Sequence, residues 1–365
     1  MSGPRRLLAI GYQGFGNLGD EAILTGIDAL LADVPVTVSA VVCGPEPGSV
    51  VGFPSARRIT SAHLLPTPTA IRALWASDGL LLSGGGLIHD HWQSVIPRYL
   101  AWIALTRLLG KRVVWVGVGV GPIRRGWQRV LARLARRLTA LALVRDLASA
   151  ELLGGVREGL EVMPDPAVFN ERPIRVPGAG NSGQLAIIIR GPAPGQRALA
   201  DAFAAALVDT CAAAEQRGLE PVLLAMAGRA DDRFVALVHG RAQERGVVIP
   251  TIALGPAPAA AMERLAACRA VISVRLHGVL MAALAGVPCV PVAYDAKVRA
   301  AAVQLGIDEL TVALEDVTPD RLLARVKEAM EPDRQVRVEL MLDALRGQRS
   351  FVAGRVVAAL GNGGG

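Results

Sequence analysis

The chain of 365 residues has few cysteines and no cysteine cluster. Neither a CxxC pair nor a Cys/His group occurs, which argues against structural zinc and against a disulfide framework. We therefore expect reduced core thiols at all four positions: Cys43, Cys211, Cys268 and Cys289.

The sequence also shows neither a signal peptide nor a membrane-spanning segment. Residues 1–6 lead directly into an apolar strand, without the apolar region and cleavage site of a signal peptide. Residues 276–294 contain no Asp, Glu, Lys or Arg, but Gly286, Pro288 and Pro291 divide them into helix, turn and strand. These features predict a soluble, cytoplasmic protein.

Aromatic residues make up only 4% of the chain, and Lys and Arg outnumber Asp and Glu by 39 to 32, a net charge of +7. This balance suits an acidic ligand or an anionic membrane surface. No basic segment interleaved with aromatic residues is present, so nucleic acid is not an expected partner. Hydrophobic residues make up 52%, enough for two buried cores.

Short apolar runs alternate with helical patterns along both halves of the chain, which predicts an α/β fold with parallel sheets. We expect strands at residues 7–11, 36–42, 79–83, 112–118, 185–190, 221–226, 247–249, 270–273 and 287–292. Residues 170–184 are rich in Pro and Gly and form the best linker candidate. The prediction is an enzyme of two lobes with a cleft: an N-terminal domain (1–172), a linker (173–183), a C-terminal domain (184–315), and C-terminal helices with a tail (316–365).

The loop after the first strand contains Gly14-x-Gly16-x-x-Gly19, the spacing of a dinucleotide-binding fingerprint. The acidic residue expected at the end of the second strand is missing from residues 40–44, so NAD or FAD is disfavoured. Asn17, Asp20 and Glu21 make the loop more polar than a plain turn requires. We interpret it as a substrate-lining loop in which these side chains orient sugar hydroxyls or supply a base.

Gly84, Gly85 and Gly86 follow an apolar strand and would let backbone N–H groups approach a ligand, although a flexible elbow is an alternative. His89 and His91 flank Asp90, and such a pair can ligate a metal. No third ligand cluster accompanies them, so we expect no metal.

Six arginines lie on or beside a helix expected near residues 124–138: Arg124, Arg125, Arg129, Arg133, Arg136 and Arg137. The other face carries Trp127, Val130, Leu131, Leu134 and Leu138. A basic amphipathic helix can rest on anionic lipid headgroups, which would bring the protein to the inner face of the membrane. A solvated surface helix is the simpler interpretation.

The strongest signal is the segment that holds Ser273, Arg275 and His277, followed by Lys297. Residues 270–273 predict a buried strand, and a helical pattern begins at Leu276. Arg275 and His277 therefore lie at a strand-to-helix turn, which favours an anion, and Lys297 follows the next strand. A buried structural Arg with a core His is the alternative.

Several motifs together resemble the polysaccharide pyruvyl transferase family, over about residues 7–306. They are Gly14-Phe15-Gly16-Asn17-Leu18-Gly19-Asp20-Glu21-Ala22, Gly84-Gly85-Gly86-Leu87, Gly117-Val118-Gly119-Val120-Gly121-Pro122, Val144-Arg145-Asp146 with Ser149, Asp165-Pro166-Ala167, Ser273-Val274-Arg275-Leu276-His277 and Tyr294-Asp295-Ala296-Lys297-Val298. The family's strand in the second domain usually reads Ser-Leu-Arg-Pro, where this chain has Ile188-Ile189-Arg190-Gly191-Pro192.

The resemblance implies a GT-B-like fold of two Rossmann-like domains facing a cleft. It implies phosphoenolpyruvate as donor substrate, no cofactor, and a ketal-linked pyruvate on a sugar of a cell-wall polysaccharide precursor, with a lipid-linked saccharide as acceptor. His277, Arg275 and Lys297 inherit the catalytic and donor-binding roles. The substrate-binding set is Asn17, Gly19, Asp20, Glu21, Gly85, Gly86, Asp90, Arg190 and Ser273.

Chemically, Arg275 can bind one oxyanion of phosphoenolpyruvate bidentately and Lys297 can neutralise another. His277 is the general acid that protonates the methylene carbon. Asp20, Glu21 or Asp90 could deprotonate the sugar hydroxyl, and the sequence does not choose among them. It also gives no indication of oligomeric state.

Two other functions stay open. A nucleotide-sugar glycosyltransferase of the GT-B type usually has a Glu for the ribose after the phosphate-binding turn, and residues 280–294 contain no acidic residue. A non-catalytic protein that binds a phosphorylated metabolite would keep Arg275 and Lys297, but His277 argues against it.

Overall fold

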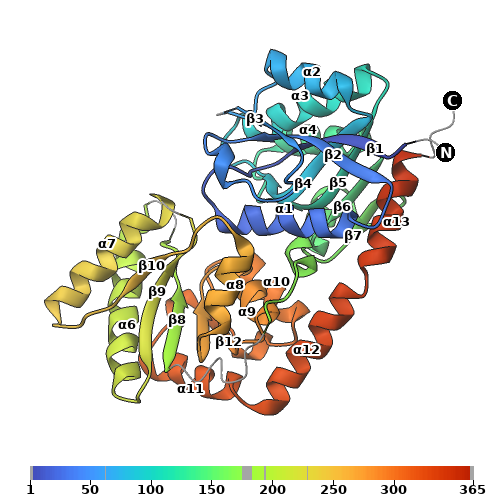
Figure 1. The fold of residues 1–365 in the computed structure, drawn as a ribbon. Helices are drawn as coiled ribbons and strands as arrows, with labels where there is room; N and C mark the ends of the chain where they lie inside the picture. The colour runs from blue at the N-terminus through green and yellow to red at the C-terminus, as the bar shows by residue number, and fades with distance from the viewer. Residues whose placement is uncertain (1–2, 62, 175–182, 193–194, 228, 362–365) are drawn as a thin grey trace. The chain divides into compact units, whose positions relative to one another are not determined.

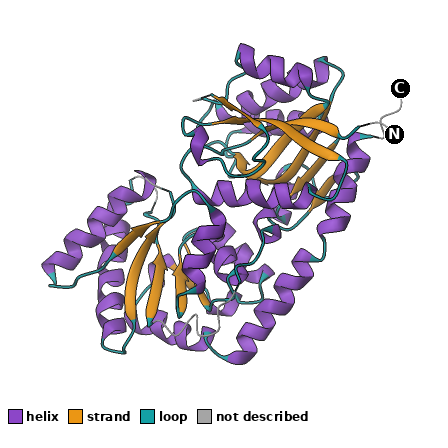
Figure 2. Cartoon of the chain, in the orientation of Figure 1, coloured by secondary structure: helices purple, strands orange, loops and turns teal. Residues whose placement is uncertain are grey.

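The computed structural model describes residues 3–61, 63–174, 183–192, 195–227 and 229–361. The chain divides into two compact units: unit 1 comprises Met1–Asn170 with Arg346–Gly365, and unit 2 comprises Glu171–Leu345. Each unit is a parallel β-sheet accompanied by helices (Figures 1 and 2). The predicted α/β class, with two Rossmann-like domains, is confirmed.

The sheet of unit 1 has the strand order β3-β2-β1-β4-β5-β6-β7, and every neighbouring pair is parallel. Leu7, Leu8, Ala9 and Ile10 of β1 are all buried, since helices cover both faces of the sheet. The strands are β1 (Arg5–Ile10), β2 (Val36–Cys43), β3 (Arg57–Thr60), β4 (Gly79–Ile88), β5 (Arg112–Val120), β6 (Leu141–Val144) and β7 (Leu160–Val162).

Two groups of helices cover this sheet, one on each face (Figure 1). One face shares a continuous apolar core with α2 (Pro68–Ala76), α3 (Val95–Leu108), α4 (Gly126–Arg137) and α5 (Leu147–Leu152). The other face carries α1 (Leu18–Leu31), α13 (Arg349–Leu360) and the 3-10 turn η2 (Pro166–Phe169). A further turn, η1 (Pro47–Ser49), follows β2.

The sheet of unit 2 has the strand order β10-β9-β8-β11-β12-β13, again parallel throughout. Its strands are β8 (Gln184–Ile188), β9 (Glu220–Ala225), β10 (Thr251–Ala253), β11 (Ala270–Ser273), β12 (Cys289–Ala293) and β13 (Val312–Ala313). Its helices are α6 (Arg197–Glu215), α7 (Arg229–Glu244), α8 (Pro258–Ala266), α9 (Leu276–Leu284), α10 (Ala296–Gln304), α11 (Pro319–Ala329) and α12 (Pro332–Arg346), with 3-10 turns η3 (Asp308–Leu310) and η4 (Leu314–Asp316).

Two local predictions were wrong. The strand expected at residues 247–249 is a loop, and β10 begins only at Thr251, because the ladder with β9 starts where Leu223 N donates to Pro250 O at 2.9 Å. The strand expected to end at Ser83 runs on through the three glycines to Ile88. Pairing with β5 continues across Gly85 and Ile88, so the glycines belong to the sheet and are not an elbow after it.

The division into units differs in detail from the domain boundaries expected from the sequence. Along the chain, the boundary between the units falls between Asn170 and Glu171, and most of the expected linker, residues 175–182, lies outside the described residues. The C-terminal helices do not form one group. Helices α11 and α12 pack with unit 2, whereas α13 returns to unit 1, where Val352, Ala353 and Val356 are buried.

Candidate functional site

In unit 2, the direction of strand addition reverses between β8 and β11, which are neighbours in the sheet but not in the chain. Ligands of open α/β sheets bind outside the carboxyl ends of the strands at such a switch point. Arg190 is the second residue after β8, and Arg275 is the second residue after β11. The fold therefore places two arginines side by side at this edge of the sheet.

Arg275 is held firmly by its surroundings. It is the N-cap residue of α9, its Nε donates to Ile189 O at 3.1 Å, and its terminal nitrogen Nη2 pairs with Asp231. Asp231 is fully buried and also accepts the backbone N–H groups of Met226 and Ala227, at 3.0 and 2.9 Å. Asp231 is not among the residues predicted from the sequence, where its available signal is an acidic residue in the first turn of the helix that follows β9.

Ser273 shapes the turn instead of facing a ligand. Its hydroxyl is buried, donates to Arg275 O at 2.8 Å and accepts from Arg275 N at 3.2 Å. A Cβ at Gly278 would lie 2.3 Å from this hydroxyl, so the first turn of α9 closes over Ser273 only with glycine there. Ser273 thus orients the backbone that presents Arg275.

Arg190 is paired with a residue that follows β12. Its Nη1 donates to Tyr294 Oη at 2.5 Å, and its guanidinium carbon lies 4.8 Å from the centre of the Tyr294 ring. Burial raises the pKa of the Tyr294 phenol to about 12, while the charges of Arg190 and Arg275 act in the opposite direction. Tyr294 therefore stays neutral at physiological pH, and the positive charges of both guanidinium groups act on its hydroxyl.

His277 and Lys297 occupy equivalent places on neighbouring elements. His277 is the second residue of α9 and Lys297 the second residue of α10, and both side chains are partly buried. Asp295 caps α10 by accepting from Lys297 N at 2.9 Å and Val298 N at 3.2 Å. Because β11 and β12 are parallel neighbours, both helix starts lie at the same edge of the sheet as Arg275.

Unit 1 has its own switch point, between the neighbouring strands β1 and β4. A cavity of about 390 Å³ lies at the carboxyl ends of these strands. Its wall contains Tyr12 and Phe15, whose rings stack 4.2 Å apart. The other lining residues are His63, Leu64, Gly86, Leu87, His89, Trp92, Ser94, Val95, Arg98 and Tyr99. The cavity thus gathers four aromatic residues in a chain where such residues are scarce.

Gly85 and Asp20 lie in close contact beside this cavity. Gly85 has φ of +81°, and a Cβ on it would lie 2.9 Å from Asp20 Oδ1. Asn17 donates its side-chain amide to Asp20 and accepts from Gly19 N at 3.3 Å. Asn17 and Gly19 therefore form the N-terminal cap of α1, and this cap holds the Asp20 carboxylate beside β4.

The three carboxylates that the sequence left as alternatives lie in different environments. Asp20 is partly exposed. Burial of the two cavity tyrosines, Tyr12 and Tyr99, is the main cause that raises their pKa, and the negative charge of Asp20 is the second. Glu21 is only 1% exposed and accepts from Gly14 N at 2.7 Å. Burial raises the pKa of Glu21 to about 7.

Asp90 acts as an anchor for the segment before α4. Its carboxylate accepts the backbone N–H groups of Arg124 and Arg125 and lies 3.9 Å from the Arg125 guanidinium. Burial would raise the pKa of Asp90, but these N–H groups and the two positive charges outweigh it and lower the pKa. Of the three carboxylates, Asp20 is thus the one that is partly exposed and whose charge acts on two residues of the cavity wall, although it does not line the cavity itself.

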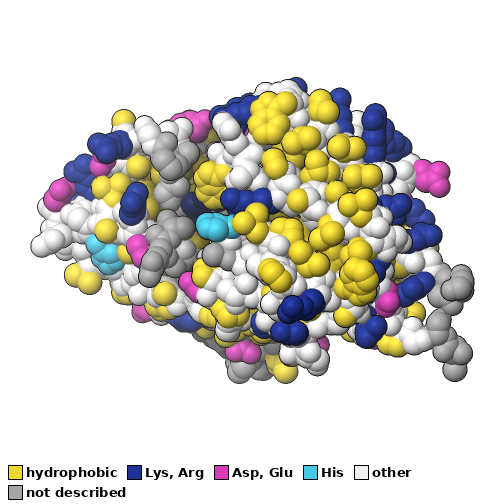
Figure 3. All heavy atoms as spheres, turned by 90° about the horizontal axis from the view of Figure 1, so that it is seen from above, with side chains coloured by type: hydrophobic (Ala, Val, Ile, Leu, Met, Phe, Trp, Pro, Cys, Tyr) yellow, Lys and Arg dark blue, Asp and Glu magenta, His cyan; other side chains and the backbone are white. Residues whose placement is uncertain are grey.

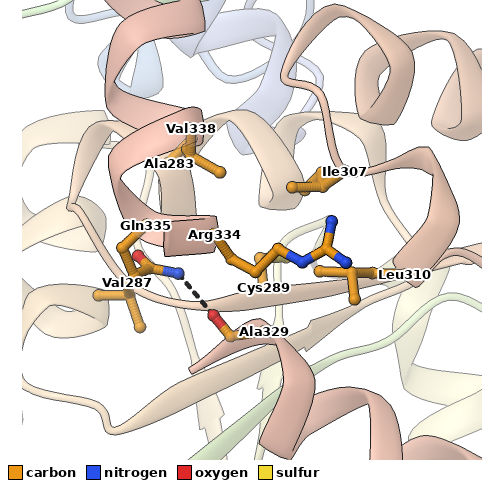
Figure 4. A pocket seen from close by; sticks show the side chains of 9 residues that line it. All are labelled: Ala283, Val287, Cys289, Ile307, Leu310, Ala329, Arg334, Gln335 and Val338. Carbon is orange, nitrogen blue, oxygen red and sulfur yellow. Dashed lines mark hydrogen bonds between the residues drawn. The ribbon is translucent and has the colours of Figure 1, made fainter. Parts of the chain in front are cut away.

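A second cavity, in unit 2, has only about 10 Å³ of volume, the size of a water site and too small for a metabolite. Figure 4 shows its lining, in which Gln335 Nε2 donates to Ala329 O at 2.7 Å. Cys289, the first residue of β12, contributes to this lining, so the cavity lies at the end of the strand opposite to Tyr294. It has no part in the arrangement around Arg275.

Among the described residues, no group of three or more His, Cys, Asp or Glu side chains is arranged to hold a metal ion. His89 and His91 lie close together, with ring centres 4.9 Å apart. All four cysteines are buried and unpaired. Within the described ranges, none of the helices has the length and apolar character needed to cross a bilayer.

Comparison with protein families finds a match over residues 17–296 to the polysaccharide pyruvyl transferase family, which confirms the resemblance seen in the motifs. No curated protein matches the chain. Similar solved structures include HepE from Anabaena in complex with UDP-glucose, with 13% identity, coverage of 98% of this chain and 99% of that chain, and a TM-score of 0.61.

Two epimerase structures are similar to the same extent. A putative UDP-N-acetylglucosamine 2-epimerase from Listeria monocytogenes has 15% identity, covers 98% of this chain and 96% of its own, and has a TM-score of 0.60. UDP-GlcNAc 2-epimerase from Methanocaldococcus jannaschii has 12% identity, coverage of 93% and 99%, and a TM-score of 0.57. At such identities the likeness concerns the fold alone, which is GT-B-like.

Proposed function

We propose that this chain, which belongs to the polysaccharide pyruvyl transferase family, moves pyruvate from phosphoenolpyruvate onto a sugar of a cell-wall polysaccharide precursor. The product is a ketal, and phosphate is released. The observation that supports this proposal best is the pair of arginines at the switch point of unit 2, whose charges both act to lower the pKa of Tyr294 against the effect of its burial. They lie at the edge where the first turns of α9 and α10 carry His277 and Lys297.

The donor carries a phosphate and a carboxylate, and both need cations in fixed positions. Arg275 has its Nε and Nη2 held by Ile189 and Asp231, so its remaining donors point in a set direction. Arg190 adds a second guanidinium on the neighbouring strand end. Lys297 supplies a point charge, and the N–H groups at the start of α9 favour an anion as well.

In the first chemical step, His277 gives a proton to the methylene carbon of phosphoenolpyruvate, and the adjacent carbon becomes oxocarbenium-like. One sugar hydroxyl adds to that carbon and loses its proton. The bond between that carbon and the phosphate oxygen then breaks, and a second hydroxyl of the same sugar adds and closes the ketal, giving up its proton to restore the acid form of His277. The cations around the donor offset the charge that gathers on the departing phosphate.

The aromatic-lined cavity of unit 1 is the proposed saccharide site. Aromatic rings present flat apolar surfaces to the carbon face of a sugar, while His63, His89, Ser94 and Arg98 offer polar groups to its hydroxyls. Asp20, held by the cap of α1, is the proposed base for the attacking hydroxyl. The acceptor in this proposal is a lipid-linked saccharide in the cytoplasm, where unpaired thiols persist.

The test is an assay of phosphate release from phosphoenolpyruvate with a lipid-linked acceptor that contains N-acetylmannosamine, together with mass spectrometry of the saccharide. The proposal predicts release only when donor and acceptor are both present, with one pyruvyl group added to the product. A thermal-shift series separates the alternatives, since a ligand stabilises only the fold that binds it. Stabilisation by a UDP-sugar but not by phosphoenolpyruvate would instead indicate a glycosyltransferase, and stabilisation by phosphoenolpyruvate without turnover would indicate a non-catalytic binding protein.

A further inference from the structure

The outer side of α4 carries large apolar side chains that face solvent. Trp127 is 49% exposed, Val130 65% and Leu134 41%. These three residues lie on one strip of the helix, because residues three, four and seven apart share a face. The side of α4 that packs on the core carries Gln128, Ala132, Ala135 and Arg136, with Leu131 and Leu138 half-buried against the same core. An ordinary surface helix turns its large apolar residues inward, so a solvent-facing strip of three such residues on α4 is unusual.

A strip of arginines runs beside these apolar residues. Arg129, Arg133 and Arg137 are spaced four residues apart and are all exposed. Within the described part of the chain, none of the three is ion-paired to a carboxylate. Around them, residues 91–145 contain 11 Lys or Arg and no Asp or Glu. The outer side of α4 is thus apolar along one strip and strongly positive along the next.

The same face of unit 1 exposes further apolar residues. Trp102 and Trp115 are buried, and Trp92 lines the cavity of unit 1, but Trp75 in α2 is 70% exposed, in addition to Trp127. Leu108, at the end of α3, is 84% exposed. Figure 3 shows hydrophobic and basic side chains together over the helices on this face, with few acidic ones. Exposed tryptophan is uncommon, because its large ring is usually buried.

We propose that this face docks on the surface of a lipid bilayer that contains anionic lipids, with α4 as the main contact. Tryptophan rings are enriched at bilayer interfaces, where one end meets the acyl chains and the N–H stays hydrated. Arginine side chains bind the phosphates of anionic headgroups. Charge complementarity selects this occupant over a second copy of the chain, which would bring arginines against arginines, and the exposed Val130 and Leu134 have no use on a nucleic acid.

The experiment is co-sedimentation of the full chain with vesicles of equal parts phosphatidylglycerol and phosphatidylcholine, compared with vesicles of phosphatidylcholine alone. The proposal predicts binding to the anionic vesicles, and weaker binding at high salt, because salt screens the headgroup charge. Arg133→Gln with Arg137→Gln should weaken partitioning about 25-fold, since each basic residue contributes about 1 kcal/mol, or about fivefold. Trp127→Ala with Val130→Ser should weaken it even at low salt.

Matched controls come from exposed residues away from this face. Phe351→Ser on α13, where Phe351 is 68% exposed, and Arg57→Gln on β3 remove the same kinds of group and should leave partitioning unchanged. Failure of the wild-type chain to bind anionic vesicles would overturn the proposal, as would equal losses in test and control variants. Binding to RNA in place of vesicles would do the same. The assay contains neither phosphoenolpyruvate nor saccharide, so its result is independent of the proposed reaction.

Discussion

Arg275 and Asp231 form a buried ion pair at the carboxyl edge of the unit 2 sheet, and the same Asp231 carboxylate accepts two backbone N–H groups from the loop after β9. The pair fixes one side of the Arg275 guanidinium. It therefore determines the direction in which the arginine can offer its remaining donors to an anion.

Asp231→Asn should impair donor use and stability together. Asparagine can still accept the backbone N–H groups, but it leaves Arg275 without its countercharge, and breaking a buried pair costs about 3–5 kcal/mol. A misplaced guanidinium should lower kcat/KM for phosphoenolpyruvate about 100-fold. Steady-state kinetics and urea unfolding measure the two effects. Asp232→Asn, at the exposed neighbouring position, is the control and should change neither.

His277→Gln should abolish most of the chemistry without abolishing donor binding. General acid catalysis contributes roughly 10²- to 10⁴-fold, so kcat for phosphate release should fall within that range. The thermal stabilisation produced by phosphoenolpyruvate should persist, because Arg190, Arg275 and Lys297 remain. Near wild-type turnover in this variant would remove His277 from the mechanism.

Substitutions of Tyr294 should separate its two contacts with Arg190. Tyr294→Phe keeps the ring beneath the guanidinium and loses one hydrogen bond, about 1 kcal/mol, so the Kd for phosphoenolpyruvate should rise roughly fivefold. Tyr294→Ala also loses the ring and should bind more weakly still. Because burial raises the pKa of Tyr294 to about 12, the difference between wild type and Tyr294→Phe should stay constant from pH 6 to pH 9. Equal donor affinity in wild type and Tyr294→Ala would show that Tyr294 does not position Arg190.

Glu21 should make the stability of the protein depend on pH. Burial raises the pKa of its carboxyl from 4.5 to about 7, so the folded state binds the proton more tightly than the unfolded state. Its contribution is therefore present below about pH 4.5 and is lost as the pH rises through 7, by roughly 3 kcal/mol in all.

Glu21→Gln should remove this dependence, since the amide oxygen can still accept from Gly14 N. Urea unfolding should find the variant more stable than wild type at pH 8 and similar to it at pH 5. Glu46→Gln, in the exposed loop after β2, is a control that should leave the pH dependence intact. Parallel curves for wild type and Glu21→Gln would contradict the assignment.

Phe15→Ala should weaken acceptor binding selectively. The substitution removes one of two stacked rings from the cavity of unit 1, and aromatic pairs contribute about 1 kcal/mol beyond their buried area. KM for the saccharide should rise about fivefold, while donor-induced stabilisation should not change. Phe351→Ala, which truncates an exposed ring on α13, should have wild-type kinetics. An increase in the donor Kd alone would assign the cavity to a different ligand.

Much of the local structure follows from residue order. The strand at residues 270–273 and the helix that begins at Leu276 were predicted at their observed positions, because the change from a short continuous apolar run to a helical period is visible within one segment. The same holds for the α/β class and for the motifs that identify the family. Arg275, His277 and Lys297 were predicted at one edge because parallel strands carry their following turns to a common side, and the strand pairing agrees.

The features that depend on long-range packing could be learned only from the tertiary structure. Asp231 forms an ion pair with Arg275, which lies 44 residues further along the chain. Tyr12, Trp92 and Tyr99 line one cavity of unit 1, because the strand order reverses at the switch point and brings the ends of β1 and β4 together. The sequence left three carboxylates as alternatives for the base, and their different degrees of burial in the structure distinguish them. The helical period of α4 established an amphipathic helix, but how its large apolar residues divide between core and solvent depends on how α4 packs against the sheet. In this protein, residue order determined the elements and their chemistry, and the pairing of distant strands decided which side chains meet.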